Sequence, residues 1–348
     1  MKRVYIRTDG NEIVATGHVM RCLSIAEQLR KAGIEVIFLL ADDKMFPILH
    51  EKRFRTKILD TKWNDLEKET DILIRYLREQ DAEVLLLDSY YITEEYLQNL
   101  SKYIRIVYID DLNKFAYPVH TILHYAPFAD VEKYKQFQQI DGRSTRFLIG
   151  GQYIPLREEF DLKKRVIKKE VHKVLITTGG TDRLNMAGII LERAQKESIW
   201  GKLEFHVVVG PFFQNKEKLY QMKEKYENII LHKNVKKMSE LMRDCDIAVS
   251  AGGSTLYEIC ACGTPCICFE IADNQNGASV WEEKGYMMYA GNAYMEKQNC
   301  IERCIRSIQT YCESYSLRCE CSEKMQELVD GKGAGRIAEY IVDMLEVH

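Results

Sequence analysis

The stretch Val84-Leu85-Leu86-Leu87 decides the fold class, because it is apolar at every position and leads directly into the polar residues Asp88-Ser89-Tyr90-Tyr91. Unbroken apolar strands are typical of parallel sheets that helices cover on both faces. On either side of this stretch, expected strands and helices alternate along the whole chain. The sequence therefore predicts an α/β fold of doubly wound parallel sheets.

Two Rossmann-like domains are expected, because the 348 residues exceed the about 100–200 residues of a usual domain. The segment 150–170 interrupts the alternation with Gly150-Gly151 and the charged run Asp161–Glu170. We therefore place residues 1–155 in an N-terminal domain and residues 156–348 in a C-terminal domain. The carboxyl ends of the strands of both domains should line a shared cleft, since ligands of such sheets bind there.

The expected elements follow from hydrophobic periodicity. In the first domain they are strands at 3–8, 34–40, 83–88, 104–109, 120–124 and 145–149, and helices at 17–32, 66–80 and 93–102. In the second domain they are strands at 172–177, 203–209, 229–232, 246–250 and 266–270, and helices at 185–196, 216–226, 237–244, 254–262, 275–284, 298–312, 316–330 and 333–346.

The composition argues against a nucleic-acid-binding protein and against a membrane-spanning protein. With 46% hydrophobic residues, 29% charged residues and a net charge of −3, the chain lacks the basic surplus of a general nucleic-acid-binding surface. Its longest apolar runs fall far short of the roughly 20 residues that span a bilayer, and its start lacks a signal peptide. We therefore expect a cytoplasmic protein without stable membrane insertion.

Eleven cysteines invite a disulfide or metal interpretation, above all the spacing of Cys260, Cys262, Cys266 and Cys268. Structural zinc usually takes pairs on turns, whereas these residues fall in an expected helix and an expected buried strand. We interpret them as reduced thiols that pack in the core. The same interpretation applies to the pairs Cys300/Cys304 and Cys319/Cys321.

The loop after the first strand, Asp9 to His18, differs from a dinucleotide-binding or P-loop motif in its glycine spacing and lack of lysine. It does place His18 at the start of a helix, next to Gly17. The helix dipole there favours a neutral imidazole, which can accept a proton as a general base. The alternative is a histidine that packs or caps the turn.

Carboxylates stand at the ends of two expected strands, Asp88 on one and Asp110-Asp111 on the other. For either position alone, an aspartate that caps the following loop or helix is the better interpretation. These carboxylates could also orient His18, because a catalytic base is usually held by a second hydrogen-bonding group.

Two glycine-rich turns connect strands to helices in the second half, at Gly179-Gly180 and at Gly252-Gly253-Ser254-Thr255. Each could aim backbone N–H groups and a helix N-terminus at one spot, which together would hold a diphosphate. Glu258, one turn into the second helix, could accept hydrogen bonds from ribose hydroxyls. The alternative is a tight turn that needs small residues.

A further polar strand end, Ala272-Asp273-Asn274-Gln275, could bind sugar hydroxyls or phosphate through Asn274 and Gln275. A simple helix N-cap explains the same residues equally well.

Taken in order, these motifs resemble the nucleotide-sugar hydrolases of pseudaminic acid biosynthesis. The resemblance covers nearly the whole chain. Its motifs are Gly17-His18-Val19-Met20-Arg21-Cys22, Asp88-x-Tyr90, Ile109-Asp110-Asp111-Leu112, Gly151-x-Tyr153-x-x-Leu156-Arg157-x-Glu159-Phe160, Gly179-Gly180-Thr181-Asp182, Ala251-Gly252-Gly253-Ser254-Thr255, Ala272-Asp273-Asn274-Gln275 and Asp330-Gly331-x-Gly333-Ala334-x-Arg336.

The resemblance implies a GT-B fold and cleavage of UDP-2,4-diacetamido-2,4,6-trideoxy-β-L-altropyranose to UDP and free sugar. It implies that His18 is the general base and that Tyr90 is a catalytic-site residue near the sugar. It further implies substrate contacts, which we expect from Gly17, Arg21, Asp88, Arg157, Gly179, Gly180, Gly252, Gly253, Ser254, Thr255, Glu258, Asn274 and Gln275. The chain departs from the family at Ser89, where histidine is common, and at Tyr91, where glycine is common.

Two other functions fit the same motifs: a GT-B glycosyltransferase with a UDP-sugar donor, and a non-catalytic nucleotide-sugar-binding protein. The expected partner in each case is a small UDP-sugar, and no nucleic acid. No motif requires a cofactor or a metal, because Asp110 and Asp111 are adjacent and do not form the spaced pair that chelates Mg²⁺ with a diphosphate. The sequence leaves the oligomeric state open.

Overall fold

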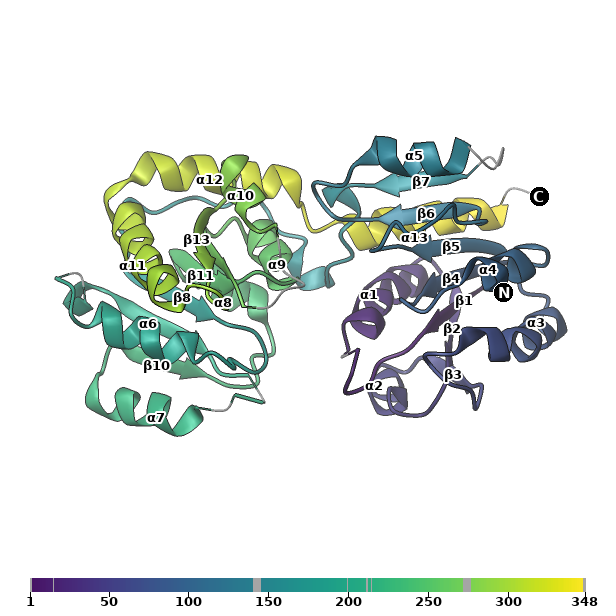
Figure 1. Cartoon of the computed structure of the whole chain (residues 1–348), viewed down its shortest axis with the longest axis horizontal. Coiled ribbons are helices and arrows are strands. Elements are labelled where there is room, and N and C mark those ends of the chain that lie inside the picture. Colours follow the sequence, from purple (N-terminus) through teal and green to yellow (C-terminus); the bar gives the residue numbers. More distant parts are fainter. Residues whose placement is uncertain are drawn as a thin grey trace. The chain divides into compact units, whose positions relative to one another are not determined.

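The computed structural model describes residues 2–14, 16–139, 145–198, 200–210, 212–213, 215–271 and 277–346. The chain divides into two compact units, each built around its own parallel sheet (Figure 1). Met1–Glu158 and Gly331–His348 form the first unit, and Glu159–Asp330 form the second. The prediction of an α/β protein with two Rossmann-like domains is confirmed.

The first unit has a seven-stranded sheet in the order β3-β2-β1-β4-β5-β6-β7, and every pairing in it is parallel. The apolar stretch that predicts the fold is β4, which lies in the middle of the sheet and is buried at every position. The strands are β1 (Arg3–Thr8), β2 (Glu35–Leu40), β3 (Arg55–Ile58), β4 (Val84–Asp88), β5 (Arg105–Ile109), β6 (Thr121–His124) and β7 (Arg146–Ile149).

Helices cover both faces of this sheet (Figure 1). The α-helices are α1 (Gly17–Lys31), α2 (Phe46–Glu51), α3 (Thr70–Glu79), α4 (Glu94–Ser101), α5 (Val131–Gln139) and α13 (Gly333–Glu346), and short 3-10 turns are η1 (Leu66–Glu69) and η2 (Gly151–Tyr153). A third turn, η3 (Glu158–Phe160), contains the point in the sequence where the second unit begins.

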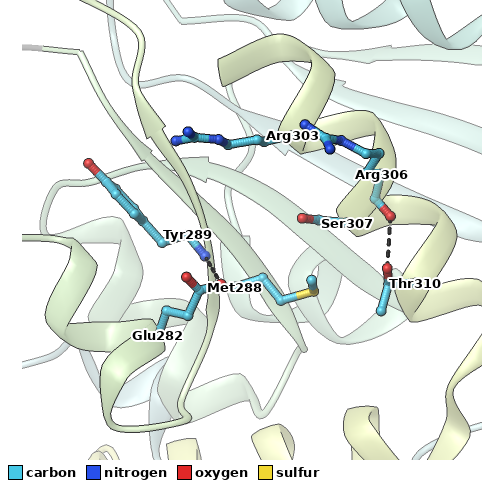
Figure 2. A pocket seen from close by; sticks show the side chains of 7 residues that line it. All are labelled: Glu282, Met288, Tyr289, Arg303, Arg306, Ser307 and Thr310. Carbon is cyan, nitrogen blue, oxygen red and sulfur yellow. Dashed lines mark hydrogen bonds between the residues drawn. The ribbon is translucent and has the colours of Figure 1, made fainter. Parts of the chain in front are cut away.

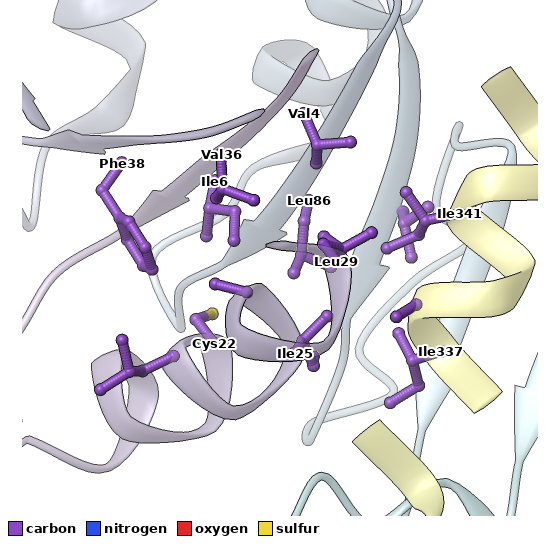
Figure 3. Packing of buried hydrophobic residues seen from close by; sticks show 14 of the residues in the cluster. Val4, Ile6, Cys22, Ile25, Leu29, Val36, Phe38, Leu86, Ile337 and Ile341 are labelled. Carbon is purple, nitrogen blue, oxygen red and sulfur yellow. The ribbon is translucent and has the colours of Figure 1, made fainter. Parts of the chain in front are cut away.

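The last helix, α13, belongs to the first unit, although the sequence interpretation placed it in the second domain. Its apolar residues Ile337 and Ile341 join the core formed by α1 and the central strands, where they pack with residues such as Ile25 and Leu29 (Figure 3). The apolar face of α13 is therefore buried against the first sheet. Glycine is required at the start of α13, because a Cβ on Gly333 would lie 2.2 Å from the carbonyl oxygen of Ile154.

The second unit has a six-stranded sheet in the order β10-β9-β8-β11-β12-β13, again with parallel pairing throughout. Its strands are β8 (Lys173–Thr177), β9 (Glu204–Val208), β10 (Ile229–His232), β11 (Ile247–Ala251), β12 (Cys266–Glu270) and β13 (Met288–Asn292). Its helices are α6 (Met186–Ala194), η4 (Trp200–Lys202), α7 (Lys216–Lys225), α8 (Met238–Asp244), α9 (Thr255–Cys262), α10 (Ser279–Glu283), α11 (Lys297–Glu313) and α12 (Tyr315–Leu328).

Apart from short 3-10 turns, the sequence interpretation missed two strands, β3 and β13, and two α-helices, α2 and α5. β3 is an edge strand of four residues without a fully buried position, so its hydrophobic pattern is weak. β13 is also an edge strand, and its ladder with β12 is irregular near Gly291. The helix expected at 66–80 begins as the 3-10 turn η1, and the helix expected at 275–284 is described from Ser279.

The cysteines are unpaired, and most are buried, including the four in α9 and β12. Cys312 and Cys319 are partly exposed, so the core interpretation does not fully hold for Cys319. Burial raises the pKa of the thiols of Cys260 and Cys266 well above the ordinary value, as expected for inert packing groups. Among the described residues, no cluster of three or more potential metal ligands occurs, and no helix is long and apolar enough to cross a membrane.

Candidate active site

Each sheet reverses its strand order at one place, and ligands of doubly wound sheets bind at the carboxyl ends of the strands there. In the first unit the reversal lies between β1 and β4, and in the second between β8 and β11. Most of the sequence-predicted site residues follow these four strands. Topology thus gathers them into one candidate region on each unit.

His18 is the second residue of α1, and it reaches across the reversal point to the end of β4. Its Nδ1 lies 2.6 Å from Oδ1 of Asp88, and both side chains are almost completely buried. Gly17, which precedes His18, is exposed, and a Cβ there would meet no atom within 4 Å. Packing therefore does not explain the glycine at position 17.

Arg21 lies one turn along α1 and holds the same carboxylate from the other side. Its Nε donates to Oδ2 of Asp88 at 2.6 Å, and its Nη2 donates to Oδ1 at 2.5 Å. Its Nη1 lies 2.8 Å from Oδ2 of Asp111 and donates to the hydroxyl of Tyr125. The sequence interpretation gave Arg21 and Asp88 substrate contacts, but these buried groups are engaged with each other and with His18.

This pairing favours the ionised form of Asp88. Burial opposes ionisation of Asp88, but the Arg21 guanidinium and hydrogen bonds from Arg21 and His18 hold the pKa of Asp88 well below its ordinary value. Nδ1 of His18 lies 2.6 Å from this carboxylate and 3.1 Å from Nη2 of Arg21, and we assign the ring hydrogen to Nδ1, as the donor to ionised Asp88. Nε2 then carries the lone pair, and it has no hydrogen-bond partner among the described residues. The imidazole is thus held in one orientation, with Nε2 turned away from Asp88.

A small pocket surrounds the His18 side chain, and aromatic rings form much of its wall. The edge of Tyr90 meets the imidazole ring at a centroid distance of 4.4 Å, and Tyr91 meets Trp63 at 5.1 Å. Burial and the nearby Asp111 carboxylate raise the pKa of Tyr90 to about 12, so Tyr90 is a neutral phenol at pH 7. The pocket is lined by Asp9, Val14, His18, Trp63, Asp88, Ser89, Tyr90 and Tyr91.

Sequence reasoning missed Trp63 because it stands alone in the polar segment between β3 and η1. It missed a buried support under the pocket as well. Arg7 binds the carboxylate of Glu69 through two nitrogens, at 2.7 and 2.8 Å, and also binds Asp9. Oδ1 of Asp9 accepts from the backbone N–H of Ala41 at 2.8 Å, which ties the loop before α1 to the end of β2. The only sequence signal for this network is a charged residue, Arg7, within an otherwise apolar expected strand.

Asp110 and Asp111 have different surroundings. Asp110 is fully buried and accepts hydrogen bonds from the backbone N–H groups of Leu112 and Asn113 and from the hydroxyls of Tyr117 and Tyr134. It stabilises its own loop, as the capping interpretation predicts. Asp88 contacts His18 directly, whereas Asp111 forms an ion pair with Arg21, which in turn binds Asp88.

In the second unit, a carboxylate from the Gly179-Gly180 turn caps the start of the helix that follows it. Asp182, which is 4% exposed, accepts from the backbone N–H of Met186 at 2.8 Å and from that of Ala187 at 3.2 Å. These are the first donors of α6, so its N-terminus is not available to an anion. Gly179 has a φ of +84°, a left-handed backbone conformation that favours glycine, whereas a Cβ on Gly180 would meet no atom within 4 Å. The tight-turn alternative therefore describes this turn better.

The helix that follows the Gly252-Gly253 turn has no such cap. The N-cap residue of α9, Ser254, makes no side-chain capping hydrogen bond. The N–H of Gly252 donates to the carbonyl of Phe269, which extends the sheet pairing. The backbone N–H groups of Ser254 and Thr255 make no hydrogen bond within the described ranges, and Ser254 is exposed. This helix start is suited to an anion.

The remaining candidates are placed as follows. Glu258 is partly exposed and lies on α9, one turn beyond the open helix start. Arg157 is partly exposed and lies in the first unit, between η2 and η3. Asn274 and Gln275 lie outside the described residues.

Residues 173–316 match the family described as the glycosyltransferase family 28 C-terminal domain. An uncharacterised protein of Methanocaldococcus jannaschii is 28% identical over 276 residues, which are 76% of this chain and 55% of that protein. The chain thus spans little more than half the length of this relative.

Two other relatives match almost their whole length. The spore coat polysaccharide biosynthesis protein SpsG of Bacillus subtilis is 23% identical over 348 residues, which are 99% of this chain and 98% of that protein. The UDP-2,4-diacetamido-2,4,6-trideoxy-β-L-altropyranose hydrolase of Campylobacter jejuni is 24% identical over 298 residues, which are 82% of this chain and 97% of that protein.

Solved structures share the fold. MurG of Acinetobacter baumannii has a TM-score of 0.71 at 13% identity, over 99% of this chain and 100% of that one. The UDP-GlcNAc 2-epimerase of Neisseria meningitidis, bound to UDP-GlcNAc, has a TM-score of 0.65 at 16% identity, over 100% of both chains. The fold is therefore of the GT-B type.

Proposed function

We propose that this protein hydrolyses a UDP-linked diacetamido-trideoxy sugar, UDP-2,4-diacetamido-2,4,6-trideoxy-β-L-altropyranose, to UDP and free sugar in pseudaminic acid biosynthesis. One observation carries the proposal: Asp88 holds Nδ1 of His18 at 2.6 Å and leaves Nε2 as a proton acceptor beside the pocket. The resemblance to a hydrolase of this name over most of the chain supports the substrate.

In the proposed reaction, Nε2 of His18 removes a proton from a water molecule as the water attacks the anomeric carbon. A bond forms between the water oxygen and that carbon, and the bond from the carbon to the diphosphate oxygen breaks, which inverts the configuration. The imidazolium that forms is stabilised by the Asp88 carboxylate. The proposed role of Tyr90, a neutral phenol at pH 7, is to donate a hydrogen bond to the sugar.

The leaving diphosphate is assigned to the second unit. The N–H groups of Ser254 and Thr255 and the dipole of α9 would stabilise its negative charge, with Gly252 and Gly253 letting the phosphates approach the backbone. Glu258 is the proposed ribose ligand. Asn274 and Gln275 keep their proposed sugar and phosphate contacts on sequence grounds alone, and Arg157 remains a proposed substrate contact.

A second candidate function is transfer of the sugar from UDP to a hydroxyl acceptor. The match of residues 173–316 to a glycosyltransferase family favours it. The same base would then deprotonate a sugar hydroxyl in place of water. Proton NMR of the reaction with and without sugar acceptors separates the two functions, because hydrolysis yields free sugar at the same rate in both cases.

The His18 proposal is tested with His18→Asn, which removes the base while keeping a side chain that can bond to Asp88. We expect kcat for UDP release to fall by about 10²–10⁴-fold, the usual contribution of a general base. The affinity for UDP should stay within about twofold, since the proposed nucleotide contacts belong to the second unit. The matched control is His50→Asn, an exposed histidine on α2.

Undiminished UDP release by His18→Asn would refute the assignment of the base. If the wild-type protein binds UDP but releases no sugar from this substrate or from other UDP-sugars, the hydrolase proposal fails as a whole. A non-catalytic binding protein would then be the better description.

A further inference from the structure

A second pocket, of about 370 Å³, lies on the second unit between the edge strand β13 and helix α11 (Figure 2). Met288 and Tyr289 are the first residues of β13, so the pocket is near the amino end of that strand. It is therefore distinct from the carboxyl-end site proposed for the nucleotide. It is lined by Glu282, Met288, Tyr289, Arg303, Arg306, Ser307 and Thr310.

Two arginines without ion pairs share this pocket. Arg303 and Arg306 extend from α11 toward the side of β13 (Figure 2). Within the described ranges neither guanidinium contacts a carboxylate, and Arg306 only donates from Nε to the carbonyl of Glu302 at 3.4 Å. Arg193, in contrast, binds the Glu302 side chain through two nitrogens at 2.7 and 3.0 Å. Glu302 thus forms its ion pair with Arg193 and interacts with Arg306 only through longer-range electrostatics.

The strand provides room for one of these guanidinium groups. Gly291 in β13 has a φ of +104°, and a Cβ at this position would lie 2.8 Å from Nη1 of Arg303. The guanidinium therefore rests directly over the strand backbone. Any larger residue at position 291 would displace it, and the left-handed backbone there also favours glycine.

Other groups in the pocket complete an anion site. Ser307 is only 7% exposed, yet its hydroxyl has no hydrogen-bond partner among the described residues. The carboxylate of Glu282 accepts from the backbone N–H of Tyr289 at 3.1 Å, so it is anchored at the strand edge. The pocket then holds two positive charges against one negative charge, and Met288 adds an apolar wall on the side of the strand (Figure 2).

We propose that this pocket binds the phosphate group of a small phosphorylated molecule through Arg303, Arg306 and Ser307. Paired guanidinium groups match the geometry and charge of phosphate. A volume of about 370 Å³ exceeds a bare phosphate and lies in the usual range of small-molecule sites, about 300–1,000 Å³. The apolar wall therefore accommodates the organic part of the ligand. The inference is independent of the proposed hydrolase activity.

The test observes binding at the pocket itself. Protein labelled with ¹³C at the methionine methyl groups is titrated with phenyl phosphate, with inorganic phosphate and with chloride, at constant ionic strength. The Met288 signal, assigned with Met288→Leu, should shift and saturate with both phosphates and more tightly with phenyl phosphate. In the double variant Arg303→Gln/Arg306→Gln, the affinity should fall by about tenfold or more, because two charge-assisted contacts are lost.

Lys223→Gln is the matched control, because it removes one positive charge from an exposed position on α7 of the same unit and should bind like wild type. If the double variant unfolds, Ser307→Ala replaces it, with an expected loss of about threefold. An equal response to chloride, an unshifted Met288 signal, or unchanged affinity in the arginine or serine variants would overturn the proposal. None of these results bears on UDP release.

Discussion

The two glycine-rich turns of the second unit follow neighbouring strands and have similar sequences, yet they differ in what their helices offer. At the Gly179-Gly180 turn, Asp182 occupies the first two N–H groups of α6. At the Gly252-Gly253 turn, the start of α9 has no side-chain cap. Glycines next to a helix are thus not enough to make an anion site. The position of one carboxylate decides whether the helix start is open.

The difference has a local cause. Asp182 is buried, and its backbone is in the left-handed region with a φ of +43°. This conformation turns its carboxylate back toward α6, which begins four residues later. Ser254 has helical backbone angles, and its hydroxyl makes no such contact. A charged cap inside the turn competes with any external anion for the same donors.

The largest change in UDP affinity is expected from adding a side-chain cap to the uncapped start of α9. Ser254→Asp places a carboxylate beside the N–H groups of α9, where it competes with and repels a diphosphate. We expect the affinity for UDP to fall by about 100-fold, or about 2.7 kcal/mol, as measured by isothermal titration calorimetry. The free energy of unfolding should rise by about 0.5–1 kcal/mol, because the helix gains a cap.

Ser254→Asn is the control for this substitution, because it has nearly the same shape without the charge. It should weaken UDP binding by less than about fivefold, a change smaller than 1 kcal/mol. Equal UDP affinity in Ser254→Asp and wild type would show that the diphosphate does not bind at this helix start.

A smaller effect is expected from removing the side-chain cap at the start of α6. Asp182→Ala removes two hydrogen bonds to the start of α6, so the free energy of unfolding should fall by about 1–2 kcal/mol. Urea denaturation measures this change, and UDP affinity should stay within about twofold of wild type. A loss of UDP binding much larger than the loss of stability would instead place the Gly179-Gly180 turn at the nucleotide.

A pH-dependent change in stability is expected at α1, where the carboxylate of Asp88 from the neighbouring strand β4 reaches the helix. The folded protein holds the pKa of Asp88 well below its ordinary value, chiefly through Arg21 and against the opposing effect of burial. The unfolded chain therefore takes up the proton first as the pH falls. The stability that ionised Asp88 supplies is present above about pH 4 and is lost below it.

Urea denaturation at a series of pH values measures this dependence in wild type and Asp88→Asn. Below about pH 4, the unfolding free energy of wild type should fall more steeply, by up to about 1.4 kcal/mol per pH unit for one proton. Identical slopes below pH 4 would show that Asp88 does not have the lowered pKa.

Much of the first unit's site could be predicted from sequence, because local patterns place His18 at a helix start and Asp88 at a strand end. Their contact could not be predicted in the same way, since 70 residues separate them and the sheet order brings β1 and β4 together. Trp63 and Glu69 escaped prediction because nothing local distinguishes them from other loop and surface residues.

The sequence by itself determined the α/β class, most strands and helices, and the list of candidate residues, because hydrophobic periodicity and turn residues act over short distances. Tertiary structure alone decided which candidates are engaged internally. In the folded protein, Arg21 and Asp88 are buried and bind each other next to His18. Asp182 caps the start of α6, whereas the start of α9 has no side-chain cap. Helix α13 packs in the first unit, far in the sequence from the rest of that unit. Such outcomes depend on which buried polar groups find partners, and partners distant in the chain meet only when the sheets assemble.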